Sequence, residues 1–167
     1  MKKTFFLLTA VLFVVIQSQG QKIIPIEHNG KKYEVLDMTA KGKVMWGGYE
    51  EIIADAAKSE SNGANNTTAI VTAVGNNSGF EGKPYAAKLC SEAKAGDKDD
   101  WYLPSKDESD AIYAFKEKFP GIEERGTIWT STEASGTTAV SKYWYTGAYY
   151  NVQKVDTYQF VCIRKVE

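Results

Sequence analysis

The last quarter of the chain contains four short runs of β-branched and aromatic residues, "TIWTSTE", "VSKYWYTG", "YYNVQKV" and "YQFVCIRKV", between Thr127 and Val166. These residue types favour strands, and within the runs the side chains alternate in character with a period of two. Gly136 and Gly147 stand between runs, where the chain needs turns. We therefore expect this part of the chain to form antiparallel strands.

A second strand region is expected near the start of the chain, from Ile23 to Met38. Apolar residues alternate there on both sides of Asn29-Gly30. Because Asn-Gly readily adopts the two positive φ angles of a tight turn, it is the strongest short-range hairpin signal. The segment therefore predicts a β-hairpin.

Between the two strand regions the apolar spacing is helical. Four apolar residues between Ala69 and Val74 recur at that spacing, after a polar loop from Ser59 to Asn66. A further helix is expected in "KPYAAKLCSEAKAGD", where Gly96 would end it. Its apolar face would carry Ala86, Leu89, Cys90 and Ala93.

A third helix is expected after "DWYLPSKDE". Ser105 and Glu108 have the spacing of a capping box, in which each side chain accepts a hydrogen bond from the other residue's backbone amide. Pro104 fits this helix start, and Pro120 would end the helix. A nucleophilic role for Ser105 would need a positioned base, usually histidine, and His28 is the only histidine. The capping role is therefore the preferred interpretation.

The order of strands, helices and strands is that of an α+β domain with segregated elements. No repeat or linker divides the chain, and about 147 residues build one ordinary hydrophobic core. We expect one domain over residues 21–167.

The first twenty residues predict a secretory signal peptide. Lys2 and Lys3 precede an apolar run from Phe5 to Ile16, which is shorter than the roughly 20 residues needed to cross a bilayer. Small residues suit cleavage after Gly20. The mature protein is expected to be exported, to a periplasm or to the medium, without membrane attachment.

Removal of that segment leaves 18 basic against 21 acidic residues, a net charge near −3. This balance argues against a nucleic-acid partner. In an exported protein a single disulfide is the simplest role for Cys90 and Cys162, and two buried free thiols are the alternative. Two cysteines make a poor metal site and His28 lies far away in the sequence, so we expect neither a metal nor a cofactor.

Several stretches together resemble the bacterial Lcl C-terminal-like domain family, a domain of unknown function associated with a C-type-lectin-like fold. They are "VMWGGY", "NGANNTTAIV", "AAKLCSEA", "DWYLPSKDE", "IWTSTE" and "FVCIRKV", in the family's order from about Lys43 to Val166. The pair "DWYLPSKDE" and "WTSTE" is the most specific part. We expect structural roles for the residues Trp101, Leu103, Pro104, Ser105, Glu108, Trp129, Ser131, Glu133 and Arg164 of these stretches.

The resemblance implies that the last strand returns beside the first and that an early helix is tied to that last strand. It further implies that a Cys90–Cys162 disulfide makes this tie. The family supplies no catalytic residues, so we expect a protein that is not an enzyme. The Glu-Pro-Asn, Gln-Pro-Asp and Trp-Asn-Asp triplets of calcium-dependent lectins are absent. Calcium-dependent sugar binding of that kind is therefore not expected.

The stretch Thr130–Glu133 places three hydroxyl groups before a carboxylate. Such a group could bind a sugar or a cation. Alternatively, the hydroxyls satisfy backbone groups where a strand turns into a loop, as serine and threonine commonly do. We favour the second interpretation.

The run "KYWYTGAYYNVQK" carries five aromatic residues and is the main candidate for ligand binding. Alternation along its two arms predicts that Trp144 and Val152 are buried in the core. It also predicts an exposed polar and aromatic row that could stack on sugars and hydrogen-bond to them. The candidate ligand-binding residues are Tyr145, Tyr149, Tyr150, Asn151 and Gln153, and the row is expected to be led by Tyr149.

The expected function is that of an exported, non-catalytic binding or adhesion domain. Its partner would be an extracellular glycan, a surface protein or another surface polymer. The alternative is a structural or assembly module that packs against a partner protein and buries its aromatic residues there.

Overall fold

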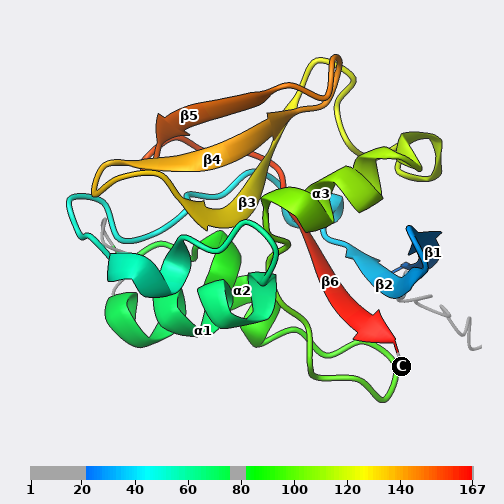
Figure 1. The fold of residues 1–167 in the computed structure, drawn as a ribbon, viewed down its shortest axis with the longest axis horizontal. Helices are drawn as coiled ribbons and strands as arrows, with labels where there is room; N and C mark the ends of the chain where they lie inside the picture. The colour runs from blue at the N-terminus through cyan, green and yellow to red at the C-terminus, as the bar shows by residue number, and fades with distance from the viewer. Residues whose placement is uncertain (1–21, 76–81, 167) are drawn as a thin grey trace, which may run out of the picture.

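A computed structural model describes residues 22–75 and 82–166, and within them the chain forms an α+β arrangement of two small antiparallel sheets and three α-helices (Figure 1). The strands are β1 (Ile23–His28), β2 (Lys31–Asp37), β3 (Thr127–Glu133), β4 (Thr138–Tyr143), β5 (Tyr149–Gln153) and β6 (Val161–Val166). The helices are α1 (Gly63–Val74), α2 (Ala86–Ser91) and α3 (Lys106–Tyr113). Short 3₁₀ turns cover Thr39–Lys41, Ala54–Ala57 and Lys116–Lys118.

The first sheet has the strand order β1-β2-β6. Asn29 and Gly30 have φ angles of 51° and 72°, so the predicted hairpin with its tight turn is confirmed. The terminal strand β6 pairs with β2, with Leu36 opposite Cys162. The expectation that the last strand lies beside the first is therefore wrong: β2 occupies the centre of the sheet, and β1 forms its outer edge.

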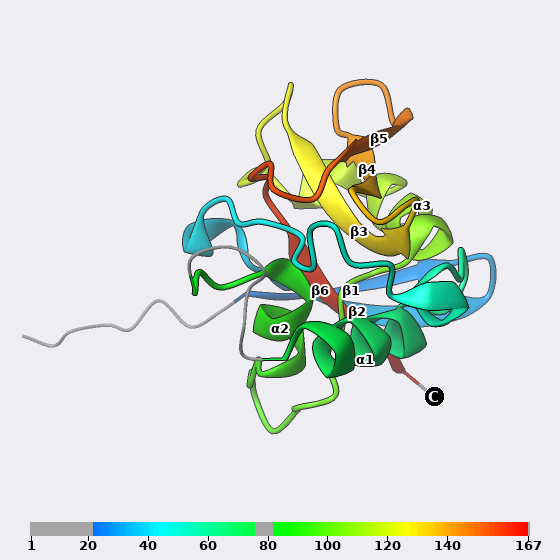
Figure 2. The ribbon, with the colours of Figure 1, turned by 90° about the vertical axis from the view of Figure 1, so that its left-hand side faces the viewer.

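The second sheet has the order β3-β4-β5 and lies above the helices α1 and α2 in Figure 2. Helix α3 contacts β1, β3 and β4, and so it packs against both sheets. The two faces of the first sheet serve different parts of the core. Val35 and Ile163 face the cluster that includes α3, whereas Leu36 and Cys162 face the cluster that includes α2.

Cys90 of α2 and Cys162 of β6 form a disulfide, with their Cα atoms 5.4 Å apart. This bond fixes the second helix to the terminal strand across 72 positions of sequence. Both cysteines are fully buried. The predicted pairing is confirmed, and the alternative of two free thiols is wrong.

The helix boundaries differ from the predicted ones. Helix α1 begins at Gly63, inside the predicted loop, because the side chain of Asn62 accepts a hydrogen bond from the amide of Asn65 and caps the helix. Helix α2 ends at Ser91, before the expected stop at Gly96. Helix α3 ends at Tyr113, and a 3₁₀ turn continues the path toward Pro120.

The residues expected to form a signal peptide, 1–20, lie outside the described part of the chain. Within residues 22–75 and 82–166, no helix has the length and apolar character that crossing a membrane requires.

Candidate functional site

The capping box at the start of α3 is present as predicted. The Ser105 hydroxyl accepts a hydrogen bond from the Glu108 amide at 3.4 Å, and the Glu108 carboxylate accepts one from the Ser105 amide at 2.9 Å. The same carboxylate also accepts hydrogen bonds from the Gly63 amide at 3.1 Å and from the Tyr102 hydroxyl at 3.1 Å. Ser105 is fully buried, so its hydroxyl serves the helix start.

The hydroxyls of "TSTE" are also engaged inside the protein. Thr130 donates to the Val140 carbonyl at 2.7 Å, and Thr132 donates to the Ser59 carbonyl at 3.0 Å. Ser131 accepts from the side-chain amide of Asn66 at 3.2 Å. These contacts agree with the favoured interpretation, in which the hydroxyls satisfy internal polar groups.

Glu133 forms a buried ion pair with Lys154, and neither side chain has any solvent-exposed area. The Lys154 ammonium lies 2.7 Å from the Glu133 carboxylate and also donates to the carbonyls of Glu51 at 2.7 Å and Gly48 at 3.1 Å. Glu133 accepts from the Ile53 amide at 3.1 Å. Burial lowers the pKa of Lys154, and the hydrogen bond from Lys154 to Glu133 opposes that shift. The pair fixes the 48–53 loop to the second sheet.

The other matched residues also have internal partners. The Trp129 indole donates to the Val44 carbonyl at 2.8 Å, and Trp101 packs in the same core cluster as Leu103. Arg164 donates to Asp100 at 2.6 Å and to Glu34 at 2.9 Å. The hydrogen bond from Arg164 is the main cause that lowers the pKa of Asp100.

Trp144 is buried as predicted, although it does not belong to a strand. Strand β4 ends at Tyr143, and Trp144 lies in the turn that follows. Its ring makes edge-on contacts with the rings of Tyr113, at 5.5 Å between centroids, and Phe119, at 6.3 Å. The strand alternation assumed for the predicted run therefore stops one residue before Trp144.

The expected exposure of Tyr149 is wrong. Its hydroxyl donates to the Lys106 carbonyl at 2.9 Å and lies 3.4 Å from the Ser109 hydroxyl, both on α3. The Lys142 ammonium lies 3.8 Å from the centre of its ring. Burial raises the pKa of Tyr149. This face of β5 points at α3 near Tyr149, and the ring is an anchor of the strand.

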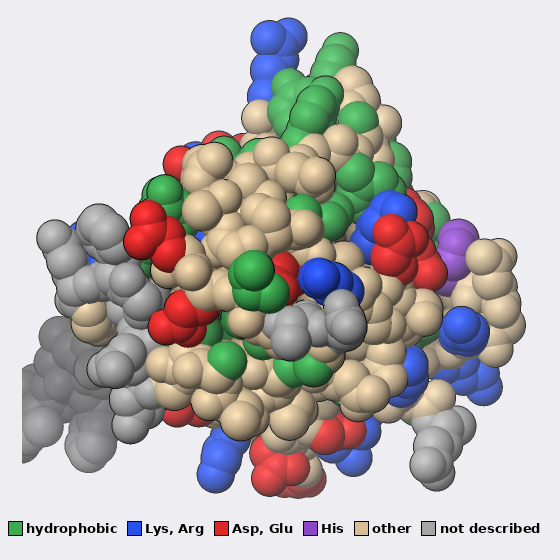
Figure 3. Space-filling view, turned by 60° about the vertical axis from the view of Figure 1, so that its left-hand side comes forward, with side chains coloured by type: hydrophobic (Ala, Val, Ile, Leu, Met, Phe, Trp, Pro, Cys, Tyr) green, Lys and Arg blue, Asp and Glu red, His purple; other side chains and the backbone are tan. Residues whose placement is uncertain are grey.

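The exposed aromatic side chains are Tyr145 and Tyr150, which are 48% and 53% accessible. Their rings lie 6.3 Å and 6.2 Å from the half-buried ring of Tyr143, and the Arg125 guanidinium lies 5.5 Å from the centre of the Tyr145 ring. We call these four residues the tyrosine surface. Figure 3 shows hydrophobic side chains gathered at the top of the molecule with a basic side chain beside them, where Figure 1 places the turn after β4.

Asn151 and Gln153 are exposed, as predicted, and they continue from the tyrosine surface along β5. Strand β5 is the last strand of its sheet. The structure thus brings Tyr145, Tyr150, Asn151 and Gln153 to one side of the molecule and turns the ring of Tyr149 inward.

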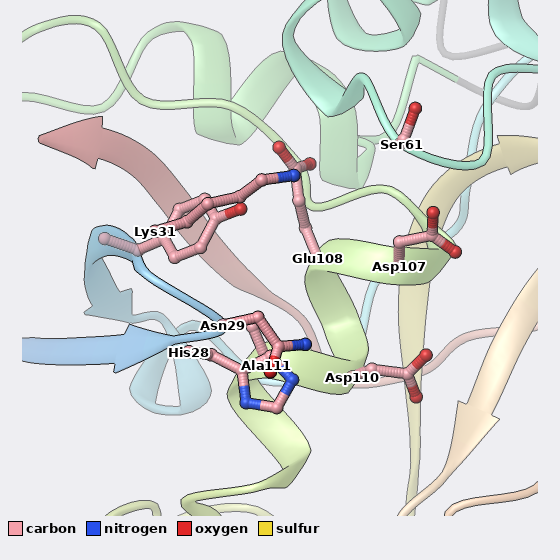
Figure 4. Close-up of a pocket in the computed structure, with 9 residues that line it drawn as sticks. His28, Asn29, Lys31, Ser61, Asp107, Glu108, Asp110 and Ala111 are labelled. Carbon is pink, nitrogen blue, oxygen red and sulfur yellow. The ribbon is translucent and has the colours of Figure 1, made fainter.

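A second concave region lies between the β1–β2 turn, the segment before α1, and α3 (Figure 4). It encloses about 310 Å³ and we call it the hairpin–helix pocket. Figure 4 shows the Lys31 side chain extending toward Glu108, and Asp107 and Asp110 projecting from α3. The lining residues are His28, Asn29, Lys31, Tyr33, Ser61, Asp107, Glu108, Asp110 and Ala111. Within the described parts of the chain, no group of three or more His, Cys, Asp or Glu residues could hold a metal ion.

Sequence reasoning missed this pocket because three distant segments build it. Asp107 and Asp110 were available as a signal, since two acids flank the capping Glu108 on the first turns of a predicted helix. Nothing local in the sequence indicates that His28 and Lys31 meet that helix.

The deeply buried Lys142 connects the two regions. Its ammonium donates to the Asp110 carboxylate at 2.7 Å and to the Gly147 carbonyl at 3.0 Å. Burial lowers the pKa of Lys142, and the hydrogen bond to Asp110 opposes the shift. Asp110 therefore lines the pocket while it holds the base of the turn that carries the tyrosine surface.

No model of a protein family matches this chain, and no curated protein matches it closely enough to count as a relative.

Proposed function

We propose that this protein is an exported, non-catalytic binding domain that recognises an extracellular glycan or a similar surface polymer through the tyrosine surface. The observation that carries the proposal is the exposure of Tyr145 and Tyr150 beside Tyr143, next to the Arg125 guanidinium. Tyrosine offers apolar ring area together with a polar hydroxyl, which suits stacking on a sugar ring. Asn151 and Gln153 add side-chain amides that hydrogen-bond to hydroxyl groups.

The fold supports this proposal at the level of architecture. The α+β arrangement, the return of β6 to the N-terminal hairpin, and the tie from α2 to β6 agree with the C-type-lectin-like fold that the Lcl C-terminal-like resemblance implies. The disulfide suits an oxidising compartment and hence export. Ser105, the one serine with the beginning of a hydrolase pattern, has its hydroxyl engaged in a helix cap.

The proposal predicts that Tyr150→Ala and Tyr145→Ala each weaken binding to the best ligand of a glycan array by about tenfold or more, because an exposed ring at the centre of a contact carries much of its energy. Each variant should change the free energy of unfolding by no more than about 0.5 kcal/mol, since exposed substitutions have small effects. Array fluorescence followed by calorimetric titration measures the first quantity, and urea unfolding measures the second.

Ile52→Ala is the matched control. Ile52 is 70% exposed and lies beside Gly136, which is in the turn at the other end of β4. This variant should bind the same ligand as tightly as the wild type. If Tyr150→Ala and Ile52→Ala bind equally well, or if no glycan on the array binds, the tyrosine surface is not a glycan site.

A second candidate function, assembly with a partner protein, is favoured by the outer edge of β5. Tyr143 pairs with Ala148, and Thr137 with Lys154, through backbone hydrogen bonds. Because hydrogen-bonded and non-bonded pairs alternate in an antiparallel ladder, the backbone groups of Tyr149, Asn151 and Gln153 point away from β4.

The β5 edge lacks the usual protection against pairing. It contains no proline and no charged residue, whereas the free edge of β1 carries Pro25 and Glu27. In a symmetric pairing of two β5 strands about Asn151, each Tyr150 would face the partner's Val152, a favourable aromatic and β-branched pair.

We expect Asn151→Lys to test this candidate, because it places like charges opposite each other at the symmetry axis. Light scattering at increasing protein concentration should show dimers for the wild type and monomers for this variant. A wild-type protein that stays monomeric at millimolar concentration contradicts self-assembly through β5 and leaves the glycan proposal intact.

A further inference from the structure

The hairpin–helix pocket contains polar groups that the protein itself does not use. Tyr33 is only 5% exposed, yet its hydroxyl makes no hydrogen bond with any described residue. The Glu108 and Asp107 carboxylates lie close enough to contribute to the raised pKa of Tyr33, after the larger contribution of burial. The phenol oxygen therefore lies on the pocket side of the ring, near the first turn of α3.

The Asp107 carboxylate is a second unused group. It is exposed, and it forms no ion pair or hydrogen bond with the described side chains. Glu108 is committed to the capping of α3 and to Tyr102, and Asp110 is committed to Lys142. Asp107 is thus the acid that remains available to a ligand.

The pocket disfavours anions. Three of its lining residues are carboxylates and only one is a lysine. The α3 amides that could otherwise attract an anion are already bonded: Lys106 donates to Thr132, Asp107 to Glu60, and Glu108 to Ser105. A ligand must therefore be neutral or positively charged.

The free donors and acceptors narrow the choice. An ammonium group fits between the Asp107 carboxylate, which accepts a charge-assisted hydrogen bond, and the lone pairs of the Tyr33 hydroxyl. At the rim, Ser61 and Asn29 offer groups that both donate and accept. A volume of about 310 Å³ lies at the lower end of small-molecule sites and suits a single sugar ring rather than a long oligomer.

We propose that the hairpin–helix pocket is a binding site for a small, hydroxylated primary amine, of the kind an amino sugar with a free amine provides. This site is separate from the tyrosine surface and does not depend on the function proposed for it. Its recognition elements are the Asp107 carboxylate for the ammonium, the Tyr33 hydroxyl as a second partner, and polar rim groups for the ligand's hydroxyls.

The test uses the full exported protein and three probes of one size: glucosamine, N-acetylglucosamine and glucuronic acid. At about pH 7 the amine of glucosamine is largely protonated, whereas the other two probes are neutral and anionic. Titrations followed by NMR should show saturable shifts of the Ser61 and Asp107–Ala111 amide signals with glucosamine, at a Kd of about 1 mM. N-acetylglucosamine should bind at least about tenfold more weakly, and glucuronic acid should not bind.

Two conservative variants locate the site. Asp107→Asn removes the charge and keeps the shape, and Tyr33→Phe removes a single oxygen and keeps the ring in the core. Each should weaken glucosamine binding about tenfold, whereas Tyr150→Ala should leave it unchanged. Equal binding of all three probes, a preference for the acid, no saturable binding of glucosamine, or unchanged affinity in both pocket variants would each overturn the proposal. None of these results bears on glycan binding at the tyrosine surface.

Discussion

Glu133→Gln is expected to lower the free energy of unfolding by about 3–5 kcal/mol, because it leaves the Lys154 ammonium charged and unpaired in the protein interior. Both side chains of the pair are fully buried and 2.7 Å apart. Domains of this size are stable by only about 5–15 kcal/mol, so the variant should lose a large part of its stability. Urea unfolding followed by circular dichroism gives the difference.

An exposed pair of the same chemistry provides the control. Lys43 and Glu123 are 2.8 Å apart, but their side chains are 45% and 54% exposed. Lys43→Met should therefore cost no more than about 1 kcal/mol, since water already stabilises both charges. Similar losses for Lys43→Met and Glu133→Gln would mean that the buried pair contributes no more than a surface contact.

A double variant separates the charge from the packing. Replacing both partners, as in Glu133→Leu with Lys154→Met, removes the lone buried charge and should recover part of the loss seen in Glu133→Gln. Recovery should be incomplete. The carbonyls of Gly48 and Glu51 and the amide of Ile53 lose the partners that now hold the 48–53 loop.

The features that sequence reasoning predicts correctly are those with local causes. Asn29-Gly30 favours positive φ angles wherever it occurs, and Ser105 with Glu108 builds a cap within four residues. The α+β order follows from periodicities that are likewise local. Each of these features appears in the structure.

The features that it misses depend on what packs against a segment. Alternation assigns Tyr149 and Asn151 to one face of β5, but α3 covers only the part of that face that holds Tyr149. Lysine is almost never fully buried, and yet Lys154 is, because Glu133 and two loop carbonyls from a distant segment surround its ammonium. The exposed tyrosines are accordingly Tyr145 and Tyr150 and not the row led by Tyr149.

The candidate sites divide in the same way. The tyrosine surface draws three of its members from one run of sequence, so the run itself indicated where to look. The hairpin–helix pocket needs the β1–β2 turn to meet α3, and no local pattern contains that distance. Its acids could be noticed in the sequence, but their partners His28, Lys31 and Tyr33 could not.

Replacing both Cys90 and Cys162 by alanine is expected to lower the free energy of unfolding by about 4 kcal/mol, since the disulfide closes a long loop and restricts the unfolded chain. The sequence separation is 72 residues, and the bond joins α2 to the strand that completes the first sheet. Without it, β6 is held to β2 by the strand ladder and by burial in the core. The midpoint of urea unfolding should fall accordingly.

Reduction of the wild-type protein is the matched experiment, because it opens the same bond without changing the sequence. A reductant should move the wild-type urea midpoint close to that of the double variant, and it should leave the double variant unchanged. The difference that remains between the two reduced proteins measures the packing of the two buried sulfur atoms alone, which is small compared with the loss of the loop constraint. A wild-type midpoint that reductant does not move, under conditions where alkylation shows both thiols to be free, would mean that burial of α2 against β6 already fixes this part of the fold without the covalent bond.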